Sequence, residues 1–427
     1  MKIKSLLGSR VSKNAIWLIA GRVYHMLLAF IVGLLTARYL GPSNYGLINY
    51  ATTFTSFFAS FCTLGINSVI IKNFVDHPDE EGITIGSAIA LRVISSALSV
   101  LMIVCITLIA DAGERETHIV VLLCAVGVIF QVMDTLNYWF QSRLMSKYAA
   151  IASVISYTVV SGYRVWLLMT GKSVAWFAVA SSIDYLVAAL ALYILYRRHG
   201  GPEFAYSRAK AKELLSGSYH FILSGMMVSI YGSTDKFMLK QLLSDAEVGY
   251  YSTAVSLCSA WVFVLSAIID SLHPVILQSF EQDRYQFERK NRQLYAIIFY
   301  CSVGVSAVLS LLATPLVSLL YGADYLPAAA PLRIVTWYTA FSYLGVARTA
   351  WVVCYNKQNY LKYLYVGAAV TNVILNALLI PGLGASGAAL ASLVTQISTI
   401  VIFPALIPDL RPNVRLMLDA IRLKDVF

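Results

Sequence analysis

Long apolar runs separated by short polar breaks occupy almost the whole 427-residue chain. A helix needs about 20 apolar residues to cross the hydrocarbon core of a bilayer, whereas a barrel strand needs only about 10 and alternates strictly. The lengths of these runs therefore predict an all-α polytopic membrane protein. We place twelve transmembrane helices at 14–37, 45–71, 83–110, 117–141, 148–169, 173–196, 214–239, 246–277, 293–320, 330–355, 361–380 and 384–407.

The loops between these spans differ in their number of Lys and Arg residues. If the N-terminus is cytoplasmic, 22 Lys and Arg residues fall in the inside stretches and only four in the outside loops. Positive residues gather on the cytoplasmic side of membrane proteins, and one missed span would invert every later loop. We therefore expect both termini to be cytoplasmic. The net charge of +10 then reflects topology, and no nucleic-acid partner is expected.

Composition supports a membrane protein along the entire chain. Only 13% of the residues are charged, about half of the usage of an ordinary soluble domain. The longest loop, 197–213, is basic and contains Gly-Pro. We predict that it is a cytoplasmic linker between two six-helix bundles, 1–196 and 214–427. The six cysteines lie in apolar stretches without a C-x-x-C pair, so neither a metal site nor a disulfide framework is indicated.

A short segment recurs in the two halves. YGLINYA (45–51) and VGYYSTA (248–254) align at an offset of 203 residues, and each follows a polar turn, GPSN or SDAE. Both copies would open the second span of their half, which indicates duplicated, pseudo-symmetric bundles. Because both halves start inside, the repeats are parallel, an arrangement known from transporters that work by alternating access.

Three motifs carry a resemblance to a known family. ARYLGPSNYGLINYA (37–51), YGADYLPAAAPLRIV (321–335) and PGLGASGAALASLVTQ (381–396) resemble the polysaccharide transporter family of the multidrug/oligosaccharidyl-lipid/polysaccharide exporter superfamily. The resemblance implies a flippase, not an enzyme, in the bacterial cytoplasmic (inner) membrane. Its substrate would be an undecaprenyl-diphosphate-linked oligosaccharide of the O-antigen or exopolysaccharide kind. A polysaccharide polymerase and a chain-length regulator are the protein partners that it suggests.

Ionisable residues inside the spans are the candidate site residues, because such groups are costly in lipid and usually face a partner or an aqueous cavity. For a cationic, substrate-binding lumen we name Arg22, His25, Arg92, Arg164, Lys236 and Arg348. For coupling to protons or sodium ions we name Asp134, Asp184 and Asp270. No other cofactor is expected.

Each candidate also has a structural interpretation. Arg22 and Arg92 lie deepest and favour a wet, anion-binding lumen. Arg164 and Lys236 are near enough to the outer interface to snorkel, and for Arg348 both interpretations are open. Asp134 could equally form an ion pair with an arginine of the lumen. Asp235, beside Lys236, is expected only to solvate the end of its helix.

Other functions are compatible with parts of the pattern. A multidrug exporter of the same superfamily would call for an acidic lumen, whereas interior cations are in excess here. A lipid II flippase typically has two further spans. A membrane polysaccharide polymerase or glycosyltransferase usually needs a large extramembrane loop. The chain has no loop of that size, and it contains neither G-x-x-x-x-G-K-[ST] nor H-E-x-x-H.

Overall fold

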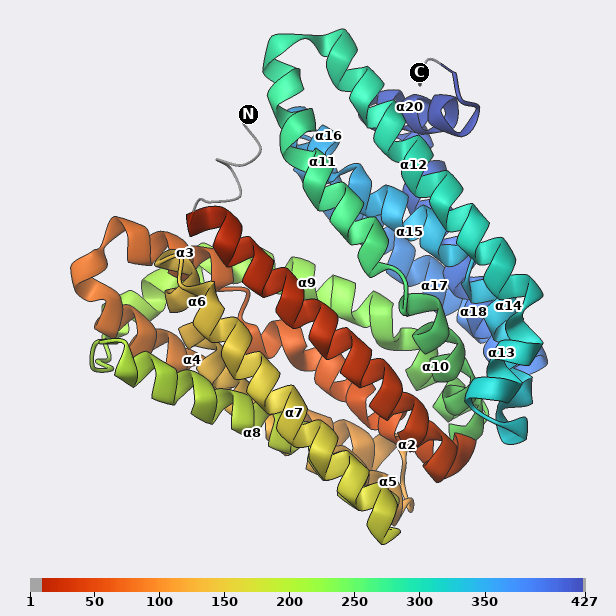
Figure 1. Cartoon of the computed structure of the whole chain (residues 1–427), viewed down its shortest axis with the longest axis horizontal. Coiled ribbons are helices and arrows are strands. Elements are labelled where there is room, and N and C mark those ends of the chain that lie inside the picture. Colours follow the sequence, from red (N-terminus) through yellow and green to blue (C-terminus); the bar gives the residue numbers. More distant parts are fainter. Residues whose placement is uncertain (1–9, 425–427) are drawn as a thin grey trace. The chain divides into compact units, whose positions relative to one another are not determined.

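The computed structural model describes residues 10–424, without the side chains at 10–16, 18–20, 22, 68, 220, 221, 223, 224, 227, 228, 230 and 231. Helices follow one another along the chain, and the described residues contain no strand (Figure 1). A helix satisfies its backbone hydrogen bonds within itself, which the bilayer interior requires. The all-α prediction is confirmed.

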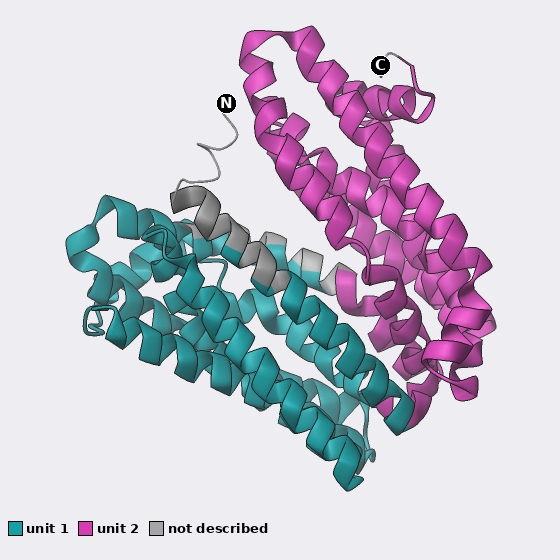
Figure 2. Ribbon diagram, viewed as in Figure 1, with its two compact units in different colours: residues 1–40, 47–229 teal, residues 41–46, 230–427 magenta. Residues whose placement is uncertain are grey.

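The chain divides into two compact units, residues 1–40 with 47–229 and residues 41–46 with 230–427 (Figure 2). Two helices cross the division: α2 (Arg10–Thr63) and α9 (Arg208–Leu242). The first unit also holds α3 (Asn67–Asp76), η1 (Pro78–Glu80), α4 (Glu81–Ala110), α5 (Arg115–Val126), η2 (Gly127–Asp134), α6 (Thr135–Ser142), α7 (Ser146–Thr170) and α8 (Val174–Arg198). The second unit begins with α10 (Asp245–Ser259), α11 (Phe263–Gln282), α12 (Arg284–Leu311), α13 (Ala313–Leu320), η3 (Ala323–Ala328) and α14 (Ala329–Val335). It continues with α15 (Tyr338–Ala347), α16 (Thr349–Cys354), η4 (Gln358–Tyr360), α17 (Leu361–Leu383), α18 (Ala385–Ile397), η5 (Ser398–Ile402), α19 (Phe403–Leu406), η6 (Pro408–Leu410) and α20 (Arg411–Ile421).

Nine helical segments among the described residues are long and apolar enough to cross a membrane. They are Val23–Thr63, Pro78–Ala110, Arg115–Ser142, Ser146–Thr170, Val174–Arg198, Phe263–Gln282, Arg284–Leu311, Gln358–Leu383 and Ala385–Leu406. The first of them joins two helices at Gly41, whose φ of 73° breaks the helical geometry. Predicted spans 246–277 and 330–355 are divided into shorter helices, α10 with α11 and α14 to α16. The count of twelve and the cytoplasmic termini stay predictions.

The two turns of the repeat pack against each other within the second unit. A Cβ atom added to Gly46 would lie 1.8 Å from the carbonyl oxygen of Asp245, and one added to Gly249 would lie 2.1 Å from that of Pro42. The offset of 203 residues relates Gly46 to Gly249 and Pro42 to Asp245. The two contacts are therefore equivalent, and each needs a residue without a side chain.

The division between the units falls inside α9, so the whole predicted linker 197–213 belongs to the first unit. Its backbone is bonded to the start of α4. The amide of Ala205 donates to the carbonyl oxygen of Gly82 at 3.1 Å, and the amide of Ser207 donates to the Ser87 hydroxyl at 3.0 Å. These bonds explain why the segment packs as part of the bundle that precedes it.

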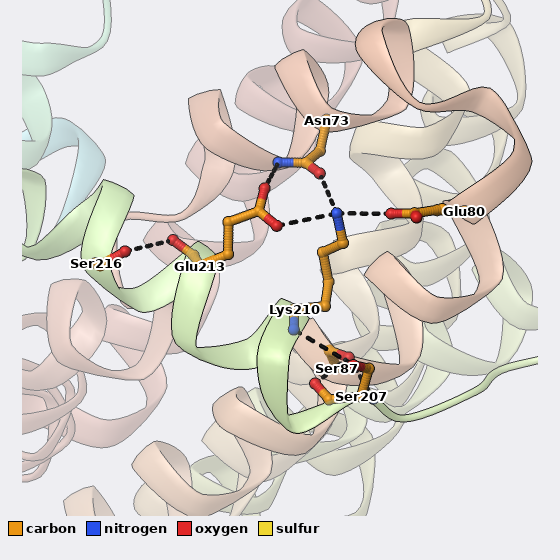
Figure 3. Close-up of polar contacts among 7 residues, drawn as sticks. All are labelled: Asn73, Glu80, Ser87, Ser207, Lys210, Glu213 and Ser216. Carbon is orange, nitrogen blue, oxygen red and sulfur yellow. Dashed lines mark hydrogen bonds and ion pairs between the residues drawn. The ribbon is translucent and has the colours of Figure 1, made fainter.

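An ion-pair cluster holds the end of this segment, and we call it the linker clasp: Asn73, Glu80, Lys210 and Glu213 (Figure 3). The Nζ atom of Lys210 lies 2.7 Å from Glu80 Oε2, 3.0 Å from Glu213 Oε2 and 3.1 Å from Asn73 Oδ1. The Asn73 amide also donates to Glu213 Oε1 at 3.2 Å. The ammonium group thus uses three acceptors from three different elements, α3, η1 and α9.

The clasp changes the titration of its members. The hydrogen bond from Lys210, followed by the one from Asn73, lowers the pKa of Glu213 below its ordinary value. Partial desolvation acts to lower the pKa of Lys210, but its hydrogen bonds to Glu80 and Glu213 outweigh this effect, and the net pKa is raised. The contribution of the Glu213 carboxylate to the free energy of unfolding is therefore complete above the ordinary glutamate pKa of about 4.3. It disappears as the pH falls through the lower pKa of the folded state. The contribution of Lys210 is complete below the ordinary lysine pKa of about 10.4. It disappears as the pH rises through the higher pKa of the folded state.

We predict that Gly249→Ala destabilises the protein by about 1–3 kcal/mol, the usual cost of forcing an extra methyl group into a packed site. The group it meets is backbone, which cannot swing away. The measurement is the free energy of unfolding, or the melting temperature, in detergent. Gly304→Ala in α12 is the matched control, because nothing lies within 4 Å of its added methyl group. Equal melting temperatures for the two variants would contradict the contact.

We also predict that Glu213→Gln lowers the melting temperature more at pH 7 than at pH 3.5, because pH 3.5 lies below the ordinary glutamate pKa, where the contribution of the charge to stability declines. The expected effect is below about 1 kcal/mol, because half-exposed ion pairs are screened by solvent. Glu203→Gln is the control, an exposed glutamate in the same segment. A difference between Glu213→Gln and wild type that is the same at both pH values would show that the charge of Glu213 does not stabilise the clasp.

Candidate functional site

A buried carboxylate that sequence reasoning undervalued is the best-defined polar centre of the second unit. Asp235 on α9 is 7% exposed. Its Oδ1 accepts hydrogen bonds from the amides of Asn372 and Asn376 at 3.0 and 2.7 Å. Its Oδ2 accepts from the Tyr251 hydroxyl at 2.5 Å and from the Ser392 hydroxyl. The expectation that Asp235 only solvates a helix end is wrong, because four side-chain donors surround it.

The Asp235 cluster, Asp235 with its four donors, is assembled by four helices. Tyr251 comes from α10, Ser392 from α18, and the two asparagines from α17. Asn372 and Asn376 are four residues apart and therefore share one face of their helix, where the Asn376 amide also bonds Asn372 Oδ1 at 3.0 Å. This polar pair within an apolar span is the sequence signal that could have revealed the site.

A cavity of about 320 Å³ opens beside the Asp235 cluster. Its lining residues are Gly232, Asp235, Lys236, Tyr251, Val255, Cys258, Ser259, Val262, Val335, Tyr338, Thr339, Ser342, Tyr343 and Ser392. Lys236, a predicted lumen cation, thus lies at a cavity. The side-chain oxygen of Asn376 is buried and has no hydrogen-bond partner in the protein. Since such an acceptor is costly to leave unpaired, the cluster retains capacity to bind a donor or a cation.

The first unit has its own polar cavity, made of two adjoining pockets of about 200 and 190 Å³. Asp134 and Asp184, both predicted coupling residues, line the larger pocket. Asp134 accepts from the Asn137 amide at 3.2 Å, and Asp184 accepts from the Ser156 hydroxyl at 2.5 Å. The structure therefore brings together two carboxylates that lie 50 positions apart in the sequence.

His25 lies at the smaller pocket of the same unit. Its ring stacks on Tyr157, with ring centroids 3.5 Å apart, and Tyr157 lines both pockets. Asp184 and Arg164 are near enough to act electrostatically on His25. Three predicted site residues, His25, Asp134 and Asp184, therefore line this cavity.

Arg92 differs from the expectation of an open lumen. Its side chain is 1% exposed within the first unit. Nη1 donates to the Thr135 hydroxyl at 2.8 Å, and Nη2 donates to the carbonyl oxygen of Gln131 at 3.1 Å. Both acceptors lie where the 3₁₀ segment η2 meets α6, and Asp134 at that junction attracts the charge. Arg92 thus stabilises an irregular segment next to the cavity and lines neither pocket there.

The remaining candidates lie away from both cavities or outside the described side chains. Arg348 is 4% exposed in the second unit, where Nη1 donates to the carbonyl oxygen of Thr399 at 3.4 Å; it does not line the cavity beside Asp235, and its lumen role stays a prediction. Asp270 is exposed on α11 and belongs to neither cavity lining. The side chain of Arg22 lies outside the described residues, and its role stays a prediction.

Solved structures with this fold are membrane transporters. The lipid II flippase MurJ in an inward closed conformation has a TM-score of 0.74 at 14% identity, covering 95% of this chain and 91% of that chain. An inward-facing multidrug resistance MATE family transporter of the MOP superfamily has a TM-score of 0.71 at 15% identity, covering 92% and 95%. At these identities the likeness shows that the chain shares the fold of these transporters.

Sequence comparison identifies the family. Residues 11–280 match the family described as polysaccharide biosynthesis protein, and the chain belongs to it. The capsular polysaccharide biosynthesis protein CapF of Staphylococcus aureus is 22% identical over 395 residues, 90% of this chain and 96% of that protein. A putative O-antigen transporter of Escherichia coli (strain K12) is 19% identical over 328 residues, 76% of this chain and 79% of that protein. The resemblance inferred from the three motifs is confirmed.

Proposed function

We propose that this protein is a flippase that moves an undecaprenyl-diphosphate-linked oligosaccharide from the inner to the outer leaflet of a bacterial cytoplasmic membrane by alternating access. The observation that carries the proposal is the combination of a polysaccharide-biosynthesis sequence with a transporter fold. A lipid-linked repeat unit is the form in which a polysaccharide precursor meets a protein that lies within the membrane.

The cavities supply the chemistry that such a headgroup needs. Sugars require hydroxyl and amide partners; hydroxyl groups line the cavities of both units, and the side-chain amides of Gln131 and Asn137 line that of the first. A diphosphate requires cationic donors. Lys236 offers one in the second unit, and in the first unit His25 at the smaller pocket offers a hydrogen-bond donor. Arg92 and Arg348 are buried, donate to protein oxygen atoms and line neither cavity, so we assign them a stabilising role in place of substrate contact.

We further propose that the Asp235 cluster is where a coupling proton or sodium ion acts. An ionisable group inside a membrane protein is a functional candidate by default, and hard cations prefer oxygen ligands. The carboxylate, the free oxygen of Asn376 and two hydroxyl groups provide such ligands in one place. Asp134 and Asp184 are the second candidates, because they share the cavity of the first unit.

The proposed transport is tested by reconstituting the purified protein in liposomes that carry a fluorescent undecaprenyl-diphosphate oligosaccharide. We expect protein-containing vesicles to expose the substrate to an added glycosidase at least tenfold faster than empty vesicles. Release of free sugar or of elongated product without added enzyme would support a polysaccharide polymerase or glycosyltransferase instead. Exchange of cationic drugs for protons without movement of the oligosaccharide would support a multidrug antiporter, and selective movement of lipid II would support a lipid II flippase.

For the coupling site, we predict that Asp235→Asn abolishes the acceleration of transport by a proton or sodium gradient. The amide keeps the size of the side chain but loses the charge that a cation would neutralise. The same variant should lose any rise in melting temperature that sodium gives the wild type, since a ligand stabilises only the state that binds it. Glu203→Gln is the control, an exposed carboxylate outside the predicted spans.

Gradient-driven transport that survives in a well-folded Asp235→Asn variant would refute this assignment. If Asp134→Asn or Asp184→Asn loses coupling in the same assay while Asp235→Asn retains it, the site lies in the first unit. Flipping that is independent of any gradient in the wild type would reject coupling and leave the flippase proposal intact.

A further inference from the structure

An apolar groove of about 530 Å³ lies in the second unit among α11, α12 and the segment that follows α20. Its lining residues are Leu272, Val275, Ile276, Lys290, Gln293, Ala296, Ile297, Tyr300 and Leu423. None of them lines the cavity beside Asp235. The volume falls in the range of sites that hold small molecules, so this α11–α12 groove is a second candidate for a ligand.

Cations surround the otherwise apolar groove. Lys290 on α12 is partly buried, and its Nζ reaches the carbonyl oxygen of Val275 only at 3.5 Å. No carboxylate of the described residues forms an ion pair with it. Leu423, which also lines the groove, stands in the sequence between Arg422 and Lys424, which are both exposed but do not line it. One cation thus lines a mostly apolar groove, and two more adjoin its lining in the sequence.

The segment before Leu423 is the amphipathic helix α20, which itself does not line the groove. Val414 and Met417 of α20 are buried, whereas Arg411 and Arg415 are exposed. A short helix with an apolar face and a basic polar face is typical of a membrane surface. The end of α20 is held to α12, because the Tyr300 hydroxyl donates to the carbonyl oxygen of Ile421 at 2.6 Å. The groove is therefore built by the fold.

The extent of the groove limits its occupant. Its lining on α12 runs from Lys290 to Tyr300, ten residues or about 15 Å of helix. Half of a hydrocarbon core of about 30 Å is the same length. The lining matches the depth of one leaflet and fits one acyl chain, whereas an undecaprenyl tail is too long for it.

We propose that the α11–α12 groove binds an anionic phospholipid of the membrane. One acyl chain lies against Ile276, Ala296 and Ile297, and the phosphate group is bound by Lys290 together with Arg422 or Lys424. Basic side chains beside a membrane-embedded surface attract anionic lipids in this way. The complementarity of both charge and polarity selects this occupant over an acidic peptide, which would leave the apolar floor uncovered.

The test measures which lipids stay with the protein. Purified wild type is equilibrated in nanodiscs that contain equal amounts of phosphatidylglycerol and phosphatidylcholine, and bound lipids are counted by native mass spectrometry after release. We expect the wild type to retain phosphatidylglycerol at least fivefold over phosphatidylcholine. The double variant Lys290→Gln, Arg422→Gln should lose this preference. Ile297→Trp, which fills the groove, should lose the lipid altogether.

Arg415→Gln is the matched control, because it removes an exposed cation of α20 that does not line the groove or adjoin Leu423. The proposal is supported if Arg415→Gln keeps the preference for phosphatidylglycerol and the double variant loses it. If both variants lose the preference equally, the lipid is attracted unspecifically to a basic surface and the proposal is overturned. A wild type without a preference for phosphatidylglycerol would also overturn it. Retention of a polyprenyl phosphate in place of phospholipid, after purification from cells, would overturn it as well. If Ile297→Trp does not fold, the charge variants decide alone.

Discussion

Water is absent from the hydrocarbon core of a bilayer, so each polar group of this chain within it must find its partner inside the protein. The buried charges follow that constraint in part, because the Nε atoms of Arg92 and Arg348 have no hydrogen-bond partner among the described residues. Arg92 uses a hydroxyl and a backbone carbonyl oxygen, Arg348 uses a backbone carbonyl oxygen, and Asp235 collects four donors. These groups tie helices that are far apart in the sequence, and the arrangement of each unit depends on them.

The same constraint separates structural charges from functional ones. A charge enclosed by protein partners stabilises the fold, as Arg92 does at the start of α6. A charge at a cavity can exchange its partner for a substrate group or an ion. Lys236 is of that kind in the second unit, and Asp134 and Asp184 are in the first. Transport would require such groups, because a partner that never leaves cannot bind a moving ligand.

Close contact between backbone segments also constrains the sequence. The two repeat turns meet through glycines whose added Cβ atoms would collide with a carbonyl oxygen, so the sequence must keep Gly46 and Gly249 there. The predicted linker likewise packs as part of the first unit, held by backbone bonds and by the clasp around Lys210. Duplication is thus visible both in the sequence and in the equivalent contacts that it produces.

The sequence by itself determined the class of fold, because hydrophobic runs of membrane length leave the backbone little choice but helix. It also located the repeat and most of the intramembrane charges. It could not assign their roles, since a polar stripe on a helix looks the same whether it faces a cavity or a neighbouring helix. Arg92 was therefore expected in a lumen and lies against α6, while Asp235 was dismissed and is the centre of a polar cluster. Only tertiary packing decides these cases, because the partners of a buried charge come from other helices, between 16 and 157 residues away in the sequence.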